Sequence, residues 1–111
     1  MSNKEKFLGE FEQMVMLSLI KLSPDAYGAT IRQYLSEQIN RDVAIGALYS
    51  TLERLEKKGM VASKLGDATP ERGGRPKRYF TVTAQGMTGL ERARDAMTTL
   101  WQNANLKEHT S

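Results

Sequence analysis

The segment from Asp42 to Gly59 constrains the fold of this chain more than any other part of the sequence. Its apolar residues recur at steps of three and four, the spacing of one face of an α-helix, and they are Ile45, Leu48, Leu52 and Leu55. The opposite face begins with small residues and ends with a long cation, in the order Gly46, Ala47, Ser50 and Arg54, with Tyr49 on the flank. Such a helix buries one face in a core and brings its small-residue end close to a ligand surface. An ordinary amphipathic helix with a solvated face has the same pattern.

A β-hairpin with a basic loop is predicted directly after this helix. The helix ends in two cations and a glycine, which suit a helix C-terminus: Lys57, Lys58 and Gly59. Residues 60–65 and 77–83 are typical of strands, and the segment 66–76 between them has three glycines and two prolines, which indicate a loop.

The positive charge of the chain is concentrated in this hairpin. Between residues 64 and 78 there are five cations against two acids, a net charge of +3 that equals the net charge of the whole chain. The cations are Lys64, Arg72, Arg75, Lys77 and Arg78. A local excess of this kind favours a polyanionic partner.

Two helices are predicted before the central one. Residues 8–22 are apolar nearly all round, so this helix needs cover on more than one side. That cover comes from its own core and a second subunit, or from its own chain alone if it is a central core helix. Residues 26–39 form the second helix, with a buried face made by Ile31, Tyr34, Leu35 and Ile39. Gly28 weakens that helix, which suggests close packing against another helix. A short turn leads into the central helix, where Ala44 is a poor N-cap, so Asp42 is the expected cap.

The last helix opens at Thr83 as N-cap and carries a stripe with heptad spacing. We expect the stripe, together with Leu17 of the first helix, to mediate dimerisation; its residues are Leu90, Ala93, Met97, Leu100 and Ala104. Packing back on residues 8–22 of the same chain is an alternative use, and the two uses are compatible. The expected fold is mainly α with a two-stranded β wing. It comprises a winged helix-turn-helix DNA-binding domain (1–83), a dimerisation helix (84–106) and a frayed tail (107–111).

Several function classes are not indicated by the sequence. The chain has 111 residues and no cysteine, which excludes disulfides, thiol catalysis and cysteine-ligated zinc. No apolar run reaches the length of a membrane span. His109 is the only histidine. A phosphate-binding glycine loop must precede a helix, whereas the glycines at 73 and 74 lie between two strands. We therefore expect no catalysis, no metal, no cofactor and no membrane contact, in a cytoplasmic protein.

Four motifs occur together in the order and spacing of a known family. They are Asp25-Ala-Tyr-Gly28, Gly46-Ala-Leu-Tyr49, the segment from Leu52 to Gly59, and Gly73-Gly-Arg-Pro-Lys-Arg-Tyr79. With them, the chain resembles the PadR family of bacterial transcriptional regulators from residue 9 to about residue 105, in its smaller subfamily. The resemblance implies a winged helix-turn-helix homodimer that binds pseudo-palindromic operators and usually represses. Ala44 departs from the Ser or Thr common there, which puts a hydroxyl–phosphate contact in doubt.

Sequence and resemblance together assign the DNA contacts. Tyr49 matches the recognition-helix tyrosine of the family, and Arg75 and Lys77 match its wing cations. We expect contacts in the major groove from Ala47, Tyr49, Ser50 and Arg54, and contacts with phosphates or a minor groove from Lys64, Arg72, Arg75 and Lys77. Gly73 and Gly74 would let the wing tip approach the duplex. Two alternatives stay open: Arg54 contacting phosphate, and Tyr49 belonging to the core.

The resemblance also suggests an effector site, since some small PadR-type repressors bind flat aromatic drugs between subunits. Trp101, the only tryptophan, would stack on such a ligand; its alternative role is to cover the dimer seam. The other expected lining residues are Phe7, Leu8, Phe11 and Met97. A competing function class is a winged-helix adaptor that binds a protein partner without specific DNA binding. The five cations of the hairpin argue against it. RNA binding is less favoured because no exposed aromatic platform is evident.

Overall fold

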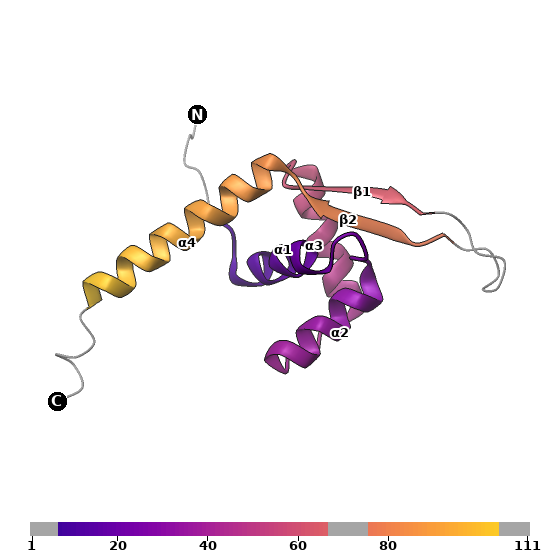
Figure 1. Ribbon diagram of the computed structural model, residues 1–111, viewed down its shortest axis with the longest axis horizontal. Helices are drawn as coiled ribbons and strands as arrows, with labels where there is room; N and C mark the ends of the chain where they lie inside the picture. The colour runs from indigo at the N-terminus through magenta and orange to yellow at the C-terminus, as the bar shows by residue number, and fades with distance from the viewer. Residues whose placement is uncertain (1–6, 67–75, 105–111) are drawn as a thin grey trace.

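The computed structural model describes residues 7–66 and 76–104, and these form four helices and a two-stranded antiparallel sheet. The elements in chain order are α1 (Glu10–Leu22), α2 (Gly28–Ile39), α3 (Ile45–Lys57), β1 (Val61–Leu65), β2 (Arg78–Val82) and α4 (Ala84–Ala104). Figure 1 shows α1, α2 and α3 grouped as a body, from which the β1–β2 hairpin and α4 extend in opposite directions. The predicted fold class, a winged helix-turn-helix followed by a long helix, is confirmed.

The core lies where α1, α2 and α3 meet the hairpin. Its fully buried large side chains come from all three helices: Met16 and Leu19, Ile31, and Leu48, Leu52 and Leu55. Two residues predicted to be buried are not, because each stands at a helix end beyond the packed region. Ile45 begins α3 and is 46% exposed, and Ile39 ends α2 and is also exposed. Thr51 is buried in their place, only 4% exposed.

The helix ends follow local chemistry with one correction. Gly59 has φ of +80° after α3, as predicted for the residue that ends this helix. Thr83 caps α4, because its Oγ1 accepts the Gly86 N–H at 3.0 Å. The prediction that Asp42 caps α3 is wrong: the helix begins at Ile45, so the N-cap is Ala44, whose methyl group accepts no hydrogen bond.

The hairpin has one face toward α3 and one face turned away from it. Phe80 is buried and pairs with Ser63, whose hydroxyl donates to Glu56 Oε2 of α3 at 2.8 Å. On the outer face Lys64 pairs with Tyr79. The Phe80 N–H donates to the Ala26 carbonyl at 2.9 Å, which ties the segment before α2 to the hairpin.

Gly28 allows α2 to approach α3, as its position in the sequence suggested. A Cβ atom added at Gly28 would lie 2.5 Å from the Tyr49 hydroxyl, closer than any real side chain could stand. The ring of Tyr49 therefore fills the space that any larger residue at position 28 would need.

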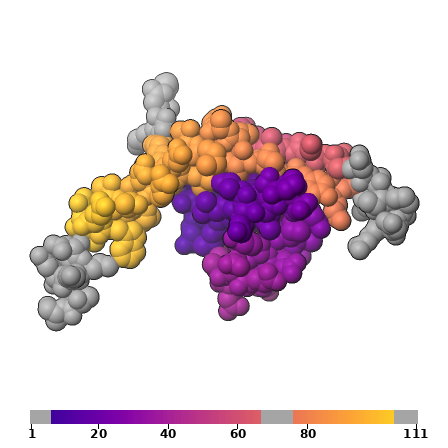
Figure 2. All heavy atoms as spheres, in the orientation of Figure 1, coloured from indigo at the N-terminus to yellow at the C-terminus, as the bar shows by residue number. Residues whose placement is uncertain are grey.

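The heptad stripe of α4 divides into a covered and an uncovered half. Leu90 and Ala93 are 7% and 5% exposed, because they pack against the core of their own chain. Met97 and Leu100 are 54% and 63% exposed, and Figure 2 shows the C-terminal half of α4 standing clear of the body. Leu90 and Ala93 thus pack back on their own chain, which is the alternative use of the stripe, while Met97 and Leu100 keep their apolar surface exposed. The expected frayed tail, 107–111, lies outside the described residues.

Candidate nucleic-acid interface

The outward face of α3 is rotated from the one the sequence predicted. Because Ile45 is exposed and Thr51 is buried, the centre of the buried stripe shifts by about 30° at the helical period of 100° per residue. The direction opposite the core then passes through four exposed residues: Gly46, Ser50, Glu53 and Lys57. Ser50 lies on this face as predicted, whereas Glu53 and Lys57 were not assigned. No sequence pattern could have identified Glu53 and Lys57, because the rotation of the face depends on the burial of Thr51.

Arg54 lies on the flank of α3 beside α1 and not at the centre of the outward face. Its Nε is 3.3 Å from Glu12 Oε2, and the same oxygen is 3.3 Å from the Nζ of Lys58. The second carboxylate oxygen, Oε1, accepts the Gly9 N–H at 2.8 Å. Glu12 is buried, while the side chains of Arg54 and Lys58 stay about half exposed. No sequence pattern indicates this cluster, because Arg54 and Lys58 follow Glu12 by 42 and 46 residues.

The pKa of Glu12 reflects these partners. Burial from water raises the pKa of the carboxyl, but the hydrogen bond from Gly9 and the contacts with Lys58 and Arg54 outweigh it. The pKa therefore lies below its ordinary value of 4.5, and the carboxylate is ionised at neutral pH.

Tyr49 is partly packed and partly exposed. Its ring centroid is 6.2 Å from that of Phe80, its hydroxyl lies against Gly28, and it is 37% exposed. Both roles considered for this residue, a core contact and a surface contact, are therefore compatible with its position. Ala47 is exposed, in the first turn of α3.

A hollow of about 310 Å³ lies beside the start of α3. It is lined by Phe11, Arg41, Asp42, Val43, Ala44 and Ala47. The guanidinium of Arg41 is 5.3 Å from the centroid of the Phe11 ring, so a cation stands next to the small-residue end of the helix. Arg41 is not among the contacts predicted from the sequence.

The wing cations within the described residues are distributed over both faces. Lys64 and Lys77 share the outer face, and the Nζ of Lys77 lies 4.7 Å from the Tyr27 ring centroid. Arg78 faces α3 instead, where its Nη1 donates to the Ser63 hydroxyl at 3.0 Å. The predicted contacts Arg72, Gly73, Gly74 and Arg75 lie outside the described residues.

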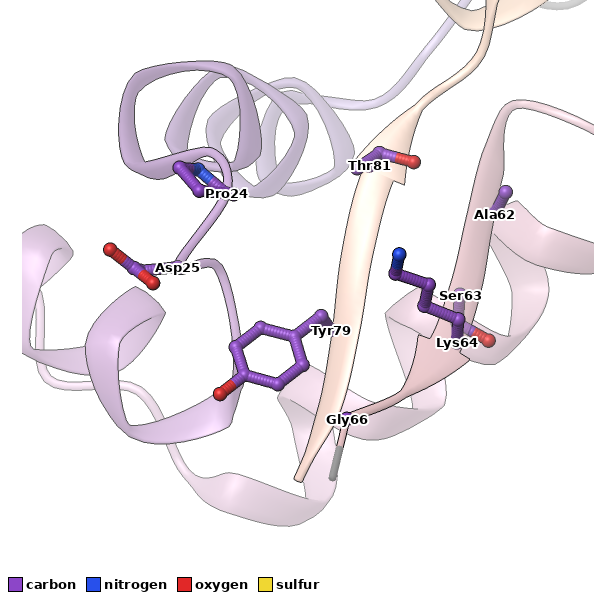
Figure 3. Close-up of a pocket in the computed structure, with 8 residues that line it drawn as sticks. All are labelled: Pro24, Asp25, Ala62, Ser63, Lys64, Gly66, Tyr79 and Thr81. Carbon is purple, nitrogen blue, oxygen red and sulfur yellow. The ribbon is translucent and has the colours of Figure 1, made fainter. Parts of the chain in front are cut away.

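A second hollow, of about 500 Å³, opens on the outer face of the wing. Its lining residues are Pro24, Asp25, Ala62, Ser63, Lys64, Gly66, Tyr79 and Thr81. Figure 3 shows Tyr79 and Thr81 on β2 between Asp25 on one side and Lys64 on the other. Across residues 7–66 and 76–104, no three acidic, histidine or cysteine side chains gather as a metal site. No helix in these ranges is long and apolar enough to cross a membrane.

The sequence profile of the transcriptional regulator PadR-like family matches residues 16–92, which is more than half of the chain. The chain belongs to the PadR-like family. A relative of this PadR-like protein, an uncharacterised protein of Lysinibacillus sphaericus, is 35% identical over 78 residues, covering 68% of each chain.

Solved structures agree with the family assignment. The X-ray structure of a PadR-like transcription factor from Bacteroides fragilis matches with a TM-score of 0.72 and 27% identity, covering 86% of both chains. The winged-helix DNA-binding protein F93 from STIV matches with a TM-score of 0.66, covering 86% of this chain and 95% of that one. At 14% identity this second match supports the fold alone. The molecule is thus a PadR-like transcriptional regulator with a winged-helix DNA-binding fold.

The residues expected to bind an effector do not all meet within one PadR-like chain. A groove of about 400 Å³ between α1 and α4 is lined by Met97 and Trp101 together with Gln13, Leu17, Ile20, Met87, Leu90, Glu91, Arg94 and Thr98. Leu8 is buried in the core, and Phe11 lines the hollow beside α3. Phe7 is exposed, and its ring centroid lies 4.3 Å from Cζ of Arg92.

Proposed function

We propose that this PadR-like regulator is a cytoplasmic, homodimeric repressor that reads a pseudo-palindromic operator. Helix 44–58 would enter the major groove and the basic wing 64–78 would contact the backbone. The proposal of a dimer is supported by an uncovered apolar surface along α1 and α4. It is formed by Leu17, Ile20, Met97, Leu100 and Trp101. Apolar patches of this kind on a small chain mark interaction sites.

The dimer is proposed to form by α4 of one subunit packing against α1 and α4 of the other. This arrangement supplies the second cover that the apolar α1 requires, because Leu17 and Ile20 are exposed within one chain. Met97, Leu100 and Ala104 would continue the seam. A twofold pair presents two α3 helices to two half-sites, about 34 Å apart along B-form DNA.

The division of DNA contacts follows exposure. Ser50, Ala47 and the exposed edge of Tyr49 are proposed to reach base edges and thymine methyl groups, for which hydroxyl and apolar groups are suited. Lys64 and Lys77, with Arg72 and Arg75, are proposed to contact phosphates, which supply affinity that depends on salt. Gly73 and Gly74 would bring the wing tip close to the duplex.

An effector site is proposed at the dimer interface, in the groove between α1 and α4. Trp101 is exposed there beside Met97, and a flat aromatic ligand could stack on the indole. Phe7, Leu8 and Phe11 are less suited, since they lie elsewhere within one chain. Release from the operator would follow if the ligand-bound dimer holds the two α3 helices at a different spacing.

Three measurements test this function. Electrophoretic shifts with the protein's own promoter fragment should give a saturable complex. A scrambled duplex should be a weak competitor for the protein. Sedimentation equilibrium should give a dimer. Failure to shift promoter or genomic fragments would favour the protein-interaction adaptor. Titration of Trp101 fluorescence with planar cationic dyes, without DNA, should quench saturably if the effector site exists.

A further inference from the structure

Glu12 is the only carboxylate within the described residues that contacts two cations of α3, and both cations stand on the same flank of that helix. Arg54 Nε and Lys58 Nζ each lie 3.3 Å from one Glu12 oxygen, and the Gly9 N–H holds the other oxygen at 2.8 Å. Glu12 is buried, so the carboxylate is fixed in place by the α1 backbone as well as by the cations. Both cation side chains remain about half exposed.

The flank of α3 faces a wall of the groove when the helix lies in the major groove. The major groove is bounded by the two phosphate backbones, about 12 Å apart. Long cations on the flank of an inserted helix are therefore placed to reach phosphates, unless another group holds them. Residues at the centre of the outward face, such as Ser50, point to the base edges instead.

We propose that Glu12 is a positioning residue that holds Arg54 and Lys58 against α1, and thereby keeps both cations away from DNA phosphates. The inference rests on DNA binding by α3, as proposed above, and adds to it a device that limits sequence-independent affinity. A cation that contacts any phosphate raises affinity for every sequence alike. Holding two such cations lowers non-specific affinity while leaving the base contacts of α3 in place.

The structure offers a matched control in the same turn of α1. Glu10 is exposed, and the described part of the chain gives it no ion pair. Glu10→Gln and Glu12→Gln change the net charge of the protein equally, at almost the same place. Only Glu12→Gln removes the group that holds Arg54 and Lys58, so a difference between the two variants reports that contact and not general electrostatics.

The experiment measures binding of the full chain to a scrambled-sequence duplex over a range of KCl concentrations. The logarithm of the binding constant falls with the logarithm of salt, with a slope of about −0.9 for each phosphate neutralised. We expect Glu12→Gln to steepen this slope by about 0.9 per released cation and per bound subunit. Glu10→Gln should leave the slope unchanged. The preference for the promoter fragment over the scrambled duplex should stay unchanged in Glu12→Gln, because the released cations contact the phosphates of both duplexes alike.

A second pair of variants separates positioning from a merely structural ion pair. Arg54→Gln should leave the wild-type slope unchanged, because the held cation contributes no phosphate contact. The same substitution in the Glu12→Gln background should reduce the steepened slope by about 0.9 per bound subunit. Equal slopes for Glu12→Gln and Glu10→Gln would overturn the inference.

The outcomes distinguish this inference from the function on which it rests. A shallower slope for Arg54→Gln in the wild-type background would also overturn the inference, even if Glu12→Gln fails to fold, since Arg54 would then already contact phosphate. If the wild-type protein binds neither duplex, the proposed operator binding fails, and this inference fails with it. If it binds and the slopes of the four variants agree, only the role of Glu12 is lost.

Discussion

Helices α3 and α4 carry the same kind of apolar stripe, yet the molecule treats the two stripes differently. The stripe of α3 is closed by its own chain from Leu48 onward, because α1, α2 and β1 all pack against the helix and Leu48, Leu52 and Leu55 are fully buried. The stripe of α4 is closed only in its first half, at Leu90 and Ala93. Helical spacing therefore shows that a face must be covered, and it does not show which chain covers it.

The difference has a simple geometric origin. α3 lies inside the three-helix body, whereas α4 starts at the end of β2 and runs outward past the end of α1 (Figure 1). The first turns of α4 remain over the core, where Gly86 packs closely against the Met60 carbonyl and the Met16 side chain. The later turns extend beyond any element of the described chain that could cover them (Figure 2).

The largest effect is expected in the closed stripe. Leu52→Ala leaves a cavity among fully buried side chains, so the free energy of unfolding should fall by about 2–5 kcal/mol. Denaturant unfolding at fixed protein concentration measures this loss. Ile45→Ala, at the exposed start of the same helix, should cost less than about 1 kcal/mol. Similar losses for the two variants would contradict the division between the closed and open parts of α3.

The open half of α4 should respond through association and not through folding. Leu100→Glu places a charge in the proposed seam, and it should weaken dimerisation by at least about tenfold, or 1.4 kcal/mol. Sedimentation equilibrium measures the dissociation constant, and far-UV circular dichroism should show an unchanged helix content. The control is Gln102→Glu, the same charge about 200° around the helix. A dimer unaffected by Leu100→Glu would show that this surface has another occupant.

The sequence predicted those features that depend on neighbours in the chain. The helix and strand bounds, the cap at Thr83 and the left-handed Gly59 came from local spacing and turn chemistry, and they are confirmed within a few residues. The exposure of Ile45, the burial of Thr51 and the Glu12–Arg54 contact depend on which helices pack together. No local pattern contains that information, so the outward face of α3 was predicted with Arg54 on it, and Glu53 was left out.

Helices α3 and α4 also differ at their N-termini, where α4 has a side-chain cap and α3 has none. Thr83 caps α4 with its hydroxyl, while Ala44 offers α3 no acceptor. Ala44→Ser should therefore stabilise the protein by about 0.5–1 kcal/mol, because a serine Oγ can accept a free N–H of the first turn. The midpoint of thermal unfolding measures the gain. An unchanged midpoint would mean that solvent already satisfies those groups equally well.

The smallest expected effect concerns the ion pairs between α3 and α1, in which Arg54 and Lys58 contact Glu12. Because the pKa of Glu12 in the folded protein lies below its ordinary value of 4.5, the contact stabilises the folded state above that pH, and this contribution is lost as the pH falls through the lower folded value. The difference in unfolding free energy between wild type and Glu12→Gln should thus be constant near neutral pH and shrink below about pH 4.5. The change should be about 0.5 kcal/mol, since water screens both half-exposed cations. Denaturant unfolding at several pH values measures it, with Glu10→Gln as the control. A difference that grows on acidification would mean that burial, and not the cations, determines the pKa of Glu12.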